Sequence, residues 1–472
     1  MSAGHDAPPN RQAPAPADDR PVEGSQTTAD ALPVAPSMGP TLAAMHLPVE
    51  RMPIDRRVAY LCVVAVGVAL AAAVIAQGLL RLSAGVTNLA FHGRLSFDTE
   101  GASPWDHRLG PFVAGVPVIG AVVIGVMARY GSRAIRGHGI PEAMEKVLTG
   151  QSRIPVRVMF LKPLSAAVAI GTGGPFGAEG PIIATGGALG SVVGQVLPTS
   201  ADERKTLLAC GAAAGMAATF GTPVAAVLLA VELLLFEFRP RSLVPVALAS
   251  AIAAAARLLF EGAGPVFPMP AVEPTALGPL VLYVLLGGLL GLAAIGVTKA
   301  VYAVEDAFER LPVHWMWWPA IGAVAVGGIG YFQPRTLGVG YANISDLLSN
   351  RLDLAAVAVL CVAKFASWSI YLGSGTSGGT LAPLLTIGGA VGTLLAAVAN
   401  HLVPGAHLSL GVGALVGMAA MFSGSARALL ASVVFAFEAT RQPAGLLPLL
   451  GGCAAAFLVS ALLMRNTIMT EK

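Results

Sequence analysis

A single acidic residue interrupts a long stretch of uncharged sequence. Between Lys162 and Asp202, Glu179 is the only Asp, Glu, Lys, Arg or His. It lies in the glycine-rich segment Gly-Ala-Glu-Gly-Pro (177–181), whose proline suits the first turn of a helix. A helix start offers unpaired N–H groups and about half a positive charge, which attract anions. We therefore predict that the Glu179 carboxylate competes with an anion at this helix start. The simpler interpretation is a carboxylate that only caps its own helix.

Two further segments place glycine and proline ahead of a helix. Residues 377–383 (Ser-Gly-Gly-Thr-Leu-Ala-Pro) lie in a region, 365–426, that has no Asp, Glu, Lys or Arg. An anion there would be held by partial charges and could leave quickly. The third segment is Gly-His-Gly-Ile-Pro-Glu (137–142), in which His138 could donate a hydrogen bond to an anion, or could be a solvated or buried structural histidine. In the helix that follows, Glu142 and Lys146 have the i, i+4 spacing of an exposed ion pair.

The composition indicates whether these segments lie in water or in a lipid bilayer. Only 12% of the 472 residues are charged and 55% are hydrophobic, with a mean hydropathy of +0.73. Soluble domains typically carry roughly 25% charged residues. The chain is therefore predicted to be an all-α polytopic membrane protein. A carboxylate in the bilayer interior costs several kcal/mol and usually has a function. The net charge of +3, without a basic stripe, argues against nucleic acid as a partner.

Apolar segments alternate with short polar connections along most of the chain. They are predicted near residues 58–80, 111–130, 155–170, 179–197, 206–218, 222–236, 242–260, 277–303, 315–331, 353–371, 381–400, 408–422, 427–438 and 443–464. Several are shorter than the roughly 20 residues that a bilayer-spanning helix needs. Short segments interrupted by glycine are typical of broken helices that meet near the middle of the membrane.

The sequence contains an internal duplication. At a shift of 202 residues, segment 171–190 matches 373–392, and 215–220 (GMAATF) matches 417–422 (GMAAMF). Two blocks in one register are not expected from shared composition. We therefore predict two related membrane repeats, 51–265 and 266–472.

The residues before the first apolar segment predict its orientation. Residues 1–50 are rich in Pro, Ala, Ser and Asp, which indicates a disordered tail. Arg51, Arg56 and Arg57 stand just ahead of the first segment, so a cytoplasmic amino terminus is expected. The expected location is a bacterial-type inner (plasma) membrane, which the chain crosses several times.

The three glycine-rich segments, in this order, resemble the motifs of the CLC family of chloride channels and chloride/proton antiporters. The family pattern G-S-G-I-P corresponds to residues 137–141, G-[KR]-E-G-P to 177–181, and G-x-F-x-P to 379–383. Segments 211–232 and 417–440 resemble the helix pairs that follow in the family, so that the resemblance covers roughly residues 58–472.

This resemblance implies a CLC-type fold of two inverted-topology repeats with broken, tilted helices. It implies a homodimer with one pore per subunit, chloride as the transported ion, no catalysed reaction and no cofactor. Glu179 corresponds to the external gating glutamate. The residues that correspond to the family's anion path are His138, Gly139, Ile140, Pro141, Ala178, Gly180, Thr380, Leu381 and Met469.

The chain also departs from the family pattern at functional positions. His138 replaces a serine, Ala178 replaces a basic residue, and Met469 takes the place of the pore tyrosine, whose hydroxyl a thioether cannot replace as a donor. Glu232 matches the first acid of a pair, but Leu233 stands where the antiporters have their proton glutamate. These departures predict passive chloride conduction or transport weakly coupled to protons. A chloride/proton antiporter is the alternative.

Two other classes of protein are alternatives to an anion pathway. A cation-coupled solute symporter with inverted repeats would need acidic groups or unwound carbonyls for sodium, and sodium-independent anion flux would exclude it. An intramembrane hydrolase could use Ser374, which is flanked by glycines, with a histidine such as His401. However, Ser374 matches Thr172 across the repeat, which favours a packing role.

Overall fold

The computed structural model describes residues 55–99 and 101–470, and the predicted tail of residues 1–50 lies outside the described residues. The described chain is helical, with two isolated β-bridges in place of a sheet. The helices of the first half are α3 (Arg56–His92), α4 (Val116–Val126), α5 (Ile140–Leu148), α6 (Val156–Gly171), α7 (Glu179–Val196), α8 (Ala201–Phe220), α9 (Pro223–Ala230) and α10 (Pro240–Glu261).

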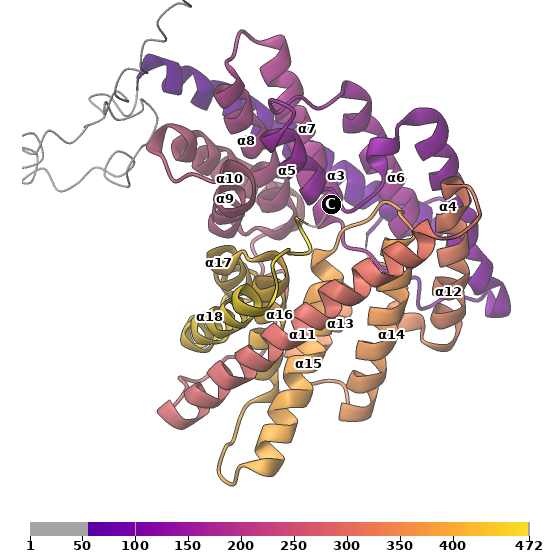
Figure 1. Cartoon of the computed structure of the whole chain (residues 1–472), viewed down its shortest axis with the longest axis vertical. Coiled ribbons are helices and arrows are strands. Elements are labelled where there is room, and N and C mark those ends of the chain that lie inside the picture. The colour runs from indigo at the N-terminus through magenta and orange to yellow at the C-terminus, as the bar shows by residue number, and fades with distance from the viewer. Residues whose placement is uncertain (1–54, 100, 471–472) are drawn as a thin grey trace, which may run out of the picture. The chain divides into compact units, whose positions relative to one another are not determined.

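The second half follows after a connection that contains no helix. Its helices are α11 (Leu277–Glu309), α12 (Trp318–Phe332), α13 (Tyr341–Leu348), α14 (Leu354–Gly373), α15 (Leu381–Leu402), α16 (Leu410–Ala426), α17 (Leu429–Thr440) and α18 (Leu446–Leu463). Short 3-10 or π turns are η2 (Gly110–Gly115), η3 (Met127–Gly131), η4 (Arg133–Ile135), η5 (Val231–Leu235), η6 (Trp315–Trp317), η7 (Pro334–Thr336) and η8 (Pro443–Gly445). In Figure 1 the first-half helices lie in the upper part of the view and most of the second-half helices in the lower part.

Within the described residues, seven helical segments are long and apolar enough to cross a bilayer. They are Arg56–His92, Gly110–Gly131, Pro240–Glu261, Leu277–Glu309, Leu354–Gly373, Leu381–Leu402 and Pro443–Leu463. Others are much shorter: α5 has nine residues and α13 has eight. At 1.5 Å per residue such helices span only about 12–14 Å, so they are too short to cross a bilayer. The predicted mixture of spanning and broken helices is confirmed.

The first helix extends beyond its predicted end near Leu80, to His92. Its last turns carry buried polar residues, among them Thr87 and Asn88. The Thr87 hydroxyl donates to the Ser83 carbonyl, and the Asn88 amide donates to the carbonyls of the following loop. Because these polar groups find partners inside the protein, the helix does not end where the apolar run ends.

Small residues bring the central helices close together. A Cβ at Gly186 of α7 would overlap the Gly211 carbonyl of α8, and a Cβ at Gly388 of α15 would be 2.5 Å from the Gly417 carbonyl of α16. Such spacing of small residues lets helix backbones approach closely in membranes. In the most apolar window of α15, 72% of the residues are buried, against 33–39% in the other spanning segments. Helix α15 therefore lies in the protein interior.

Candidate functional site

The starts of α7 and α15 are hydrogen-bonded to one another. The Gly177 amide donates to the Gly379 carbonyl at 3.2 Å, and the Gly379 amide donates to the Gly177 carbonyl at 3.0 Å. A Cβ at Gly379 would be 2.5 Å from the Gly177 carbonyl, so only glycine allows this approach. Helix α7 begins at Glu179 and α15 begins at Leu381, each with a proline as its third residue.

The start of α5 joins the same place. The Gly137 amide donates to the Thr376 carbonyl at 3.0 Å, and the Gly378 amide approaches the Gly137 carbonyl at 3.4 Å. Gly139 has a φ of +96°, which strongly favours glycine, and a Cβ there would be 2.6 Å from the Gly180 carbonyl. The three helix starts singled out in the sequence therefore converge within the protein.

The Glu179 side chain lies where these helix starts meet. It is completely buried, and a Cβ at Gly177 would overlap its carboxylate, so the side chain folds back over its own break. The carboxylate lies against the peptide groups of both Glu179 and Ala382, and therefore contacts the starts of α7 and α15. The Tyr341 hydroxyl donates to Oε1 at 2.8 Å, whereas Oε2 has no hydrogen-bond partner among the described residues. Glu179 thus does more than cap its own helix.

The remaining predicted anion-path residues fall into two groups. Gly139, Ile140, Ala178, Gly180, Thr380 and Leu381 are buried around the junction of the helix starts. His138, Pro141 and Met469 instead line a neighbouring cavity of about 630 Å³. The His138 carbonyl lies against Gly180, which links the two groups.

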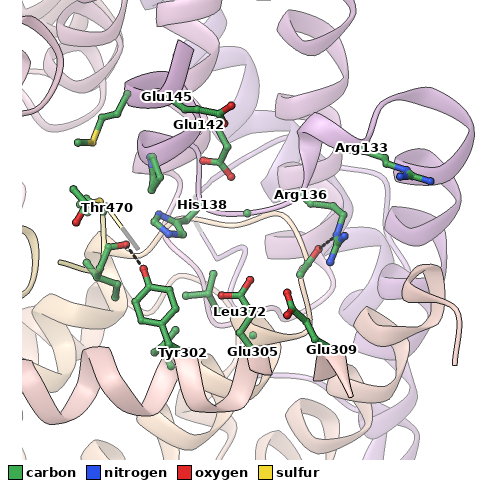
Figure 2. Close-up of a pocket in the computed structure, with 18 of the residues that line it drawn as sticks. Arg133, Arg136, His138, Glu142, Glu145, Tyr302, Glu305, Glu309, Leu372 and Thr470 are labelled. Atoms are coloured by element: carbon green, nitrogen blue, oxygen red, sulfur yellow. Dashed lines mark hydrogen bonds between the residues drawn. The ribbon is translucent and has the colours of Figure 1, made fainter. Parts of the chain in front are cut away.

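The cavity that holds His138 and Met469 is rich in charged side chains. The lining comes from η4 and the residue after it, from α5 and from α11: Arg133, Arg136, Glu142, Glu145, Glu305 and Glu309. Figure 2 shows His138 on one side of this cavity and the two α11 glutamates on another. Tyr302 of α11 donates to the Ile468 carbonyl at 2.9 Å, which holds the carboxy-terminal segment with Met469 against the cavity.

The predicted ion pair between Glu142 and Lys146 is wrong. The Glu142 carboxylate accepts a hydrogen bond from the Gly139 amide at 2.7 Å, and Lys146 lies 3.5 Å from Glu145 instead. The amide at a helix start has no helical partner, so an acid three residues later is drawn to it. This contact stabilises the start of α5.

Two buried lysines that the sequence motifs did not single out hold the loops before α5 and α13. Lys162 donates to the carbonyls of Ile135 and Gly137 at 2.9 and 2.8 Å, and Lys364 donates to those of Thr336 and Gly338, both at 3.0 Å. Lys364 also acts electrostatically on Glu179. A sequence signal for them exists, because Lys162 and Lys364 are 202 residues apart, the same shift as the duplicated blocks.

The sequence motifs also do not mark a fourth helix start, that of α13. Gly338-Val339-Gly340 corresponds to Gly137-His138-Gly139 at a shift of 201 residues, and Tyr341 then takes the place of Ile140. Gly340 has a φ of +79° and directly precedes α13. Because this copy lacks the proline and the charged residues of the first, only the repeat could have revealed it.

Glu232 and Glu438 cap each other's helices. The Glu232 carboxylate accepts from the Leu430 and Ala431 amides at the start of α17, both at 3.0 Å. The Glu438 carboxylate accepts from the Val224 and Ala225 amides at the start of α9, at 3.1 and 2.8 Å. Beside Glu232, the side chain of Leu233 is buried. Glu232 is therefore engaged at the start of α17, and the leucine beside it cannot carry a proton.

We expect Glu232→Ala to destabilise the protein by about 1–3 kcal/mol, because two α17 amides lose their acceptor. Glu232→Gln should cost less, since its amide oxygen can still accept one bond. Thermal unfolding in detergent measures the effect, with Glu145→Ala, which removes an exposed carboxylate, as the control. Equal midpoints for Glu232→Ala and the control would contradict the capping role.

The proposed nucleophile of a hydrolase is not arranged for catalysis. Ser374 Oγ donates to the Tyr371 carbonyl at 2.6 Å, within the end of its own helix. His401 lies in the last turn of α15 and is exposed, whereas Ser374 is buried before the start of that helix. The geometry gives no support to a Ser374–His401 pair.

Comparisons with known proteins agree with this architecture. The family model described as "Voltage gated chloride channel" matches residues 119–461. The H(+)/Cl(-) exchange transporter ClcA of Vibrio parahaemolyticus is 31% identical over 352 residues, which are 71% of this chain and 73% of that protein. The ClcA of Salmonella agona is 30% identical over 341 residues, covering 69% of this chain and 71% of that protein.

Solved structures show the same fold. A slow cyanobacterial Cl-/H+ antiporter superposes with a TM-score of 0.76 at 23% identity, covering 87% of this chain and 96% of that one. A CLC-type fluoride/proton antiporter gives a TM-score of 0.72 at 20% identity, covering 86% and 96%. Because the family model spans most of the chain and the all-helical CLC-type fold is present, this multi-pass membrane protein belongs to the CLC family of anion transport proteins.

Proposed function

We propose that the chain carries chloride, or a similar small anion, along a path that passes the joined starts of α7 and α15, with Glu179 as the gate. The observation that carries this proposal is the Glu179 carboxylate itself, completely buried and folded between the two helix starts. The charged carboxylate occupies the place where helix N-termini would otherwise attract an anion. Protonation removes its charge, and a competing anion displaces it.

The residues around the junction suit an anion held by partial charges. The amides of Ile140, Thr380 and Leu381 belong to helix starts, where N–H groups lack helical partners. The Gly139 amide also belongs to a helix start but donates to the Glu142 carboxylate at 2.7 Å, so an anion would compete with that contact. The buried Thr380 hydroxyl has no hydrogen-bond partner among the described residues, which leaves it available to a ligand. Neighbouring Ala178 adds no charge there. This site binds through dipoles, which allows release as well as capture.

The second part of the proposal concerns coupling to protons. We infer passive conduction or weak coupling, because Leu233 is a buried hydrocarbon and Glu232 is engaged at the start of α17. In the cavity, Met469 takes the place of the family's pore tyrosine and has no hydroxyl to donate. An anion beside His138 would therefore find one hydrogen-bond donor fewer. The alternative is a chloride/proton antiporter, which the names of the similar ClcA proteins favour.

The test is a planar bilayer or liposome recording of the purified protein under separate chloride and proton gradients. For passive chloride conduction, the reversal potential should move by about 59 mV per tenfold chloride gradient and should ignore the proton gradient. Uphill proton pumping with a fixed chloride/proton ratio would select the antiporter. Absence of anion flux from folded protein would contradict the whole proposal.

Assembly and orientation form a further part of the proposal. We propose that the chain is a homodimer in a bacterial-type inner membrane, with a cytoplasmic amino terminus, because Arg56 and Arg57 stand at the start of the first span. Light scattering of the detergent-solubilised protein measures the first property. Labelling of single cysteines placed before α3 measures the second.

A further inference from the structure

The buried Glu179 carboxylate accepts a hydrogen bond from a hydroxyl on α13, a helix that lies outside the three family motifs. Tyr341, the first residue of α13, donates from its phenol to Glu179 Oε1 at 2.8 Å. Among the described residues this is the one side chain that hydrogen-bonds the carboxylate. A hydroxyl donor stabilises a carboxylate in its charged form more than in its protonated form.

Aromatic packing fixes the direction of the Tyr341 ring. The ring meets Phe220 at 5.9 Å with an interplanar angle of 74°, and Phe267 at 5.7 Å with an angle of 64°. Phe220 in turn packs edge-on against Phe435 of α17 at 5.2 Å. Such edge-to-face contacts are favourable geometries for aromatic pairs. The ring is therefore aimed by its neighbours, independently of the carboxylate.

Phe267 reaches this cluster from the connection between α10 and α11. Its side chain is completely buried, and its amide donates to the Ala439 carbonyl at 3.0 Å. The connection that separates the two halves in sequence thus supplies a packing partner to Tyr341. Connecting segments usually run over the protein surface, so a fully buried aromatic residue in this one indicates a packing role.

The backbone under Tyr341 is held from the other side by Lys364. The ammonium group donates to the carbonyls of Thr336 and Gly338, and it lies close to Gly340, where a Cβ would be 3.3 Å away. Lys364 also attracts the Glu179 carboxylate electrostatically. The same ammonium group therefore holds the backbone just before α13 and attracts the Glu179 carboxylate.

We propose that Tyr341 is the positioning residue of the gate: its hydroxyl holds the Glu179 carboxylate in the closed position at the junction of α7 and α15. The inference rests on the proposed gating role of Glu179 and adds the element that keeps the gate shut. Opening then requires the carboxylate to leave a hydroxyl donor as well as the helix amides.

Other charged groups surround this contact and stay unchanged when only the phenol is altered. Lys364 acts electrostatically on Glu179 from α14. His138 lies in the segment before α5, with its carbonyl against Gly180. Glu261, which acts on Tyr341 from the end of α10, is paired with Arg257 at 2.8 Å. A change in the pH dependence of Tyr341→Phe can therefore be compared directly with that of the original protein.

The experiment measures anion efflux from proteoliposomes between about pH 5 and pH 8, around the range in which carboxylates and histidines titrate. Tyr341→Phe keeps the aromatic packing and removes only the donor. At the upper pH, flux should rise about tenfold, the effect of losing roughly one charged hydrogen bond. The half-maximal pH should move upward by about one unit, because a carboxylate without its donor takes up a proton more readily.

Two controls distinguish the possible results. Tyr283→Phe removes a phenol that donates to the Ser409 carbonyl at 3.1 Å, away from Glu179, and should leave flux and its pH dependence unchanged. In a Glu179→Gln background, Tyr341→Phe should add nothing. Phe267→Leu, which loosens the ring but keeps the hydroxyl, should shift the curve in the same direction by a smaller amount.

Failure of this inference differs from failure of the gate assignment. If Tyr341→Phe follows the original pH curve while Glu179→Gln is open, the positioning role is wrong and the gate stands. An equal rise in both backgrounds would show that the phenol acts on the path itself, which overturns the inference. If Glu179→Gln itself retains the pH dependence, the proposed function fails.

Discussion

Anion flux through the Glu179→Gln protein should be high and independent of pH. The amide has nearly the volume of the carboxylate but carries no charge, so the helix starts of α7 and α15 no longer hold it against a competing anion. In the original protein, flux should rise as the pH falls, because protonation of the buried carboxylate removes its charge. Between about pH 8 and pH 5 we expect a change of at least about tenfold, which the variant should lose.

Efflux of chloride from proteoliposomes at matched protein density measures this difference. Glu273→Gln, in the connection between α10 and α11, is the matched control, because it removes an exposed carboxylate that is far in sequence from the starts of α5, α7 and α15. Glu179→Ala should behave like Glu179→Gln if charge alone closes the path. A Glu179→Gln protein whose flux follows the original pH curve would show that another group is the gate.

Gly177→Ala should open the path at high pH although Glu179 is unchanged. The added Cβ would occupy the place of the Glu179 carboxylate, so the charged side chain can no longer fold into its closed position. The φ of Gly177 lies outside the positive region, so alanine can adopt this backbone conformation. We expect flux at about pH 8 to approach that of Glu179→Gln, a rise of at least about tenfold.

Gly187→Ala is the control for a methyl group added to the same helix. The nearest atom to its Cβ would be 3.5 Å away, an ordinary contact, so this variant should keep the original flux and pH dependence. Folding of both variants is checked by gel filtration and thermal unfolding. A folded Gly177→Ala protein that closes normally at high pH would show that the gate closes elsewhere than over its own glycine.

Particular segments show how far the sequence predicted this site. The starts of α5, α7 and α15 were recognised because glycine, proline and an isolated acid are local signals whose physics does not depend on distant neighbours. The start of α13 was missed, since Gly338-Val339-Gly340-Tyr341 carries neither a proline nor a charge. Lys364 was missed for a related reason, because its acceptors are carbonyls that lie 26 and 28 residues away in sequence.

Charge spacing was the least reliable signal. Glu142 and Lys146 have the separation of a helical ion pair, yet Glu142 turns to the Gly139 amide. An i, i+4 pair contributes only a few tenths of a kcal/mol on an exposed helix, whereas an unpaired amide at a helix start is a stronger attraction for a nearby acid. Glu232 of η5 likewise finds its partners on α17, which no spacing within its own helical segment could predict.

The sequence by itself was enough to predict that the chain lies in a membrane, which class of fold it adopts, and that the ion it attracts is an anion. Scarce charge, a repeat at a fixed shift and glycine-rich helix starts are local properties, and they suffice to predict a two-repeat membrane protein whose helix N-termini attract an anion. Only the tertiary structure decided what the Glu179 side chain touches. The phenol of Tyr341 and the charge of Lys364 reach Glu179 from the second half of the chain. Contacts between residues more than 150 positions apart depend on how the repeats close on each other, which no local pattern records.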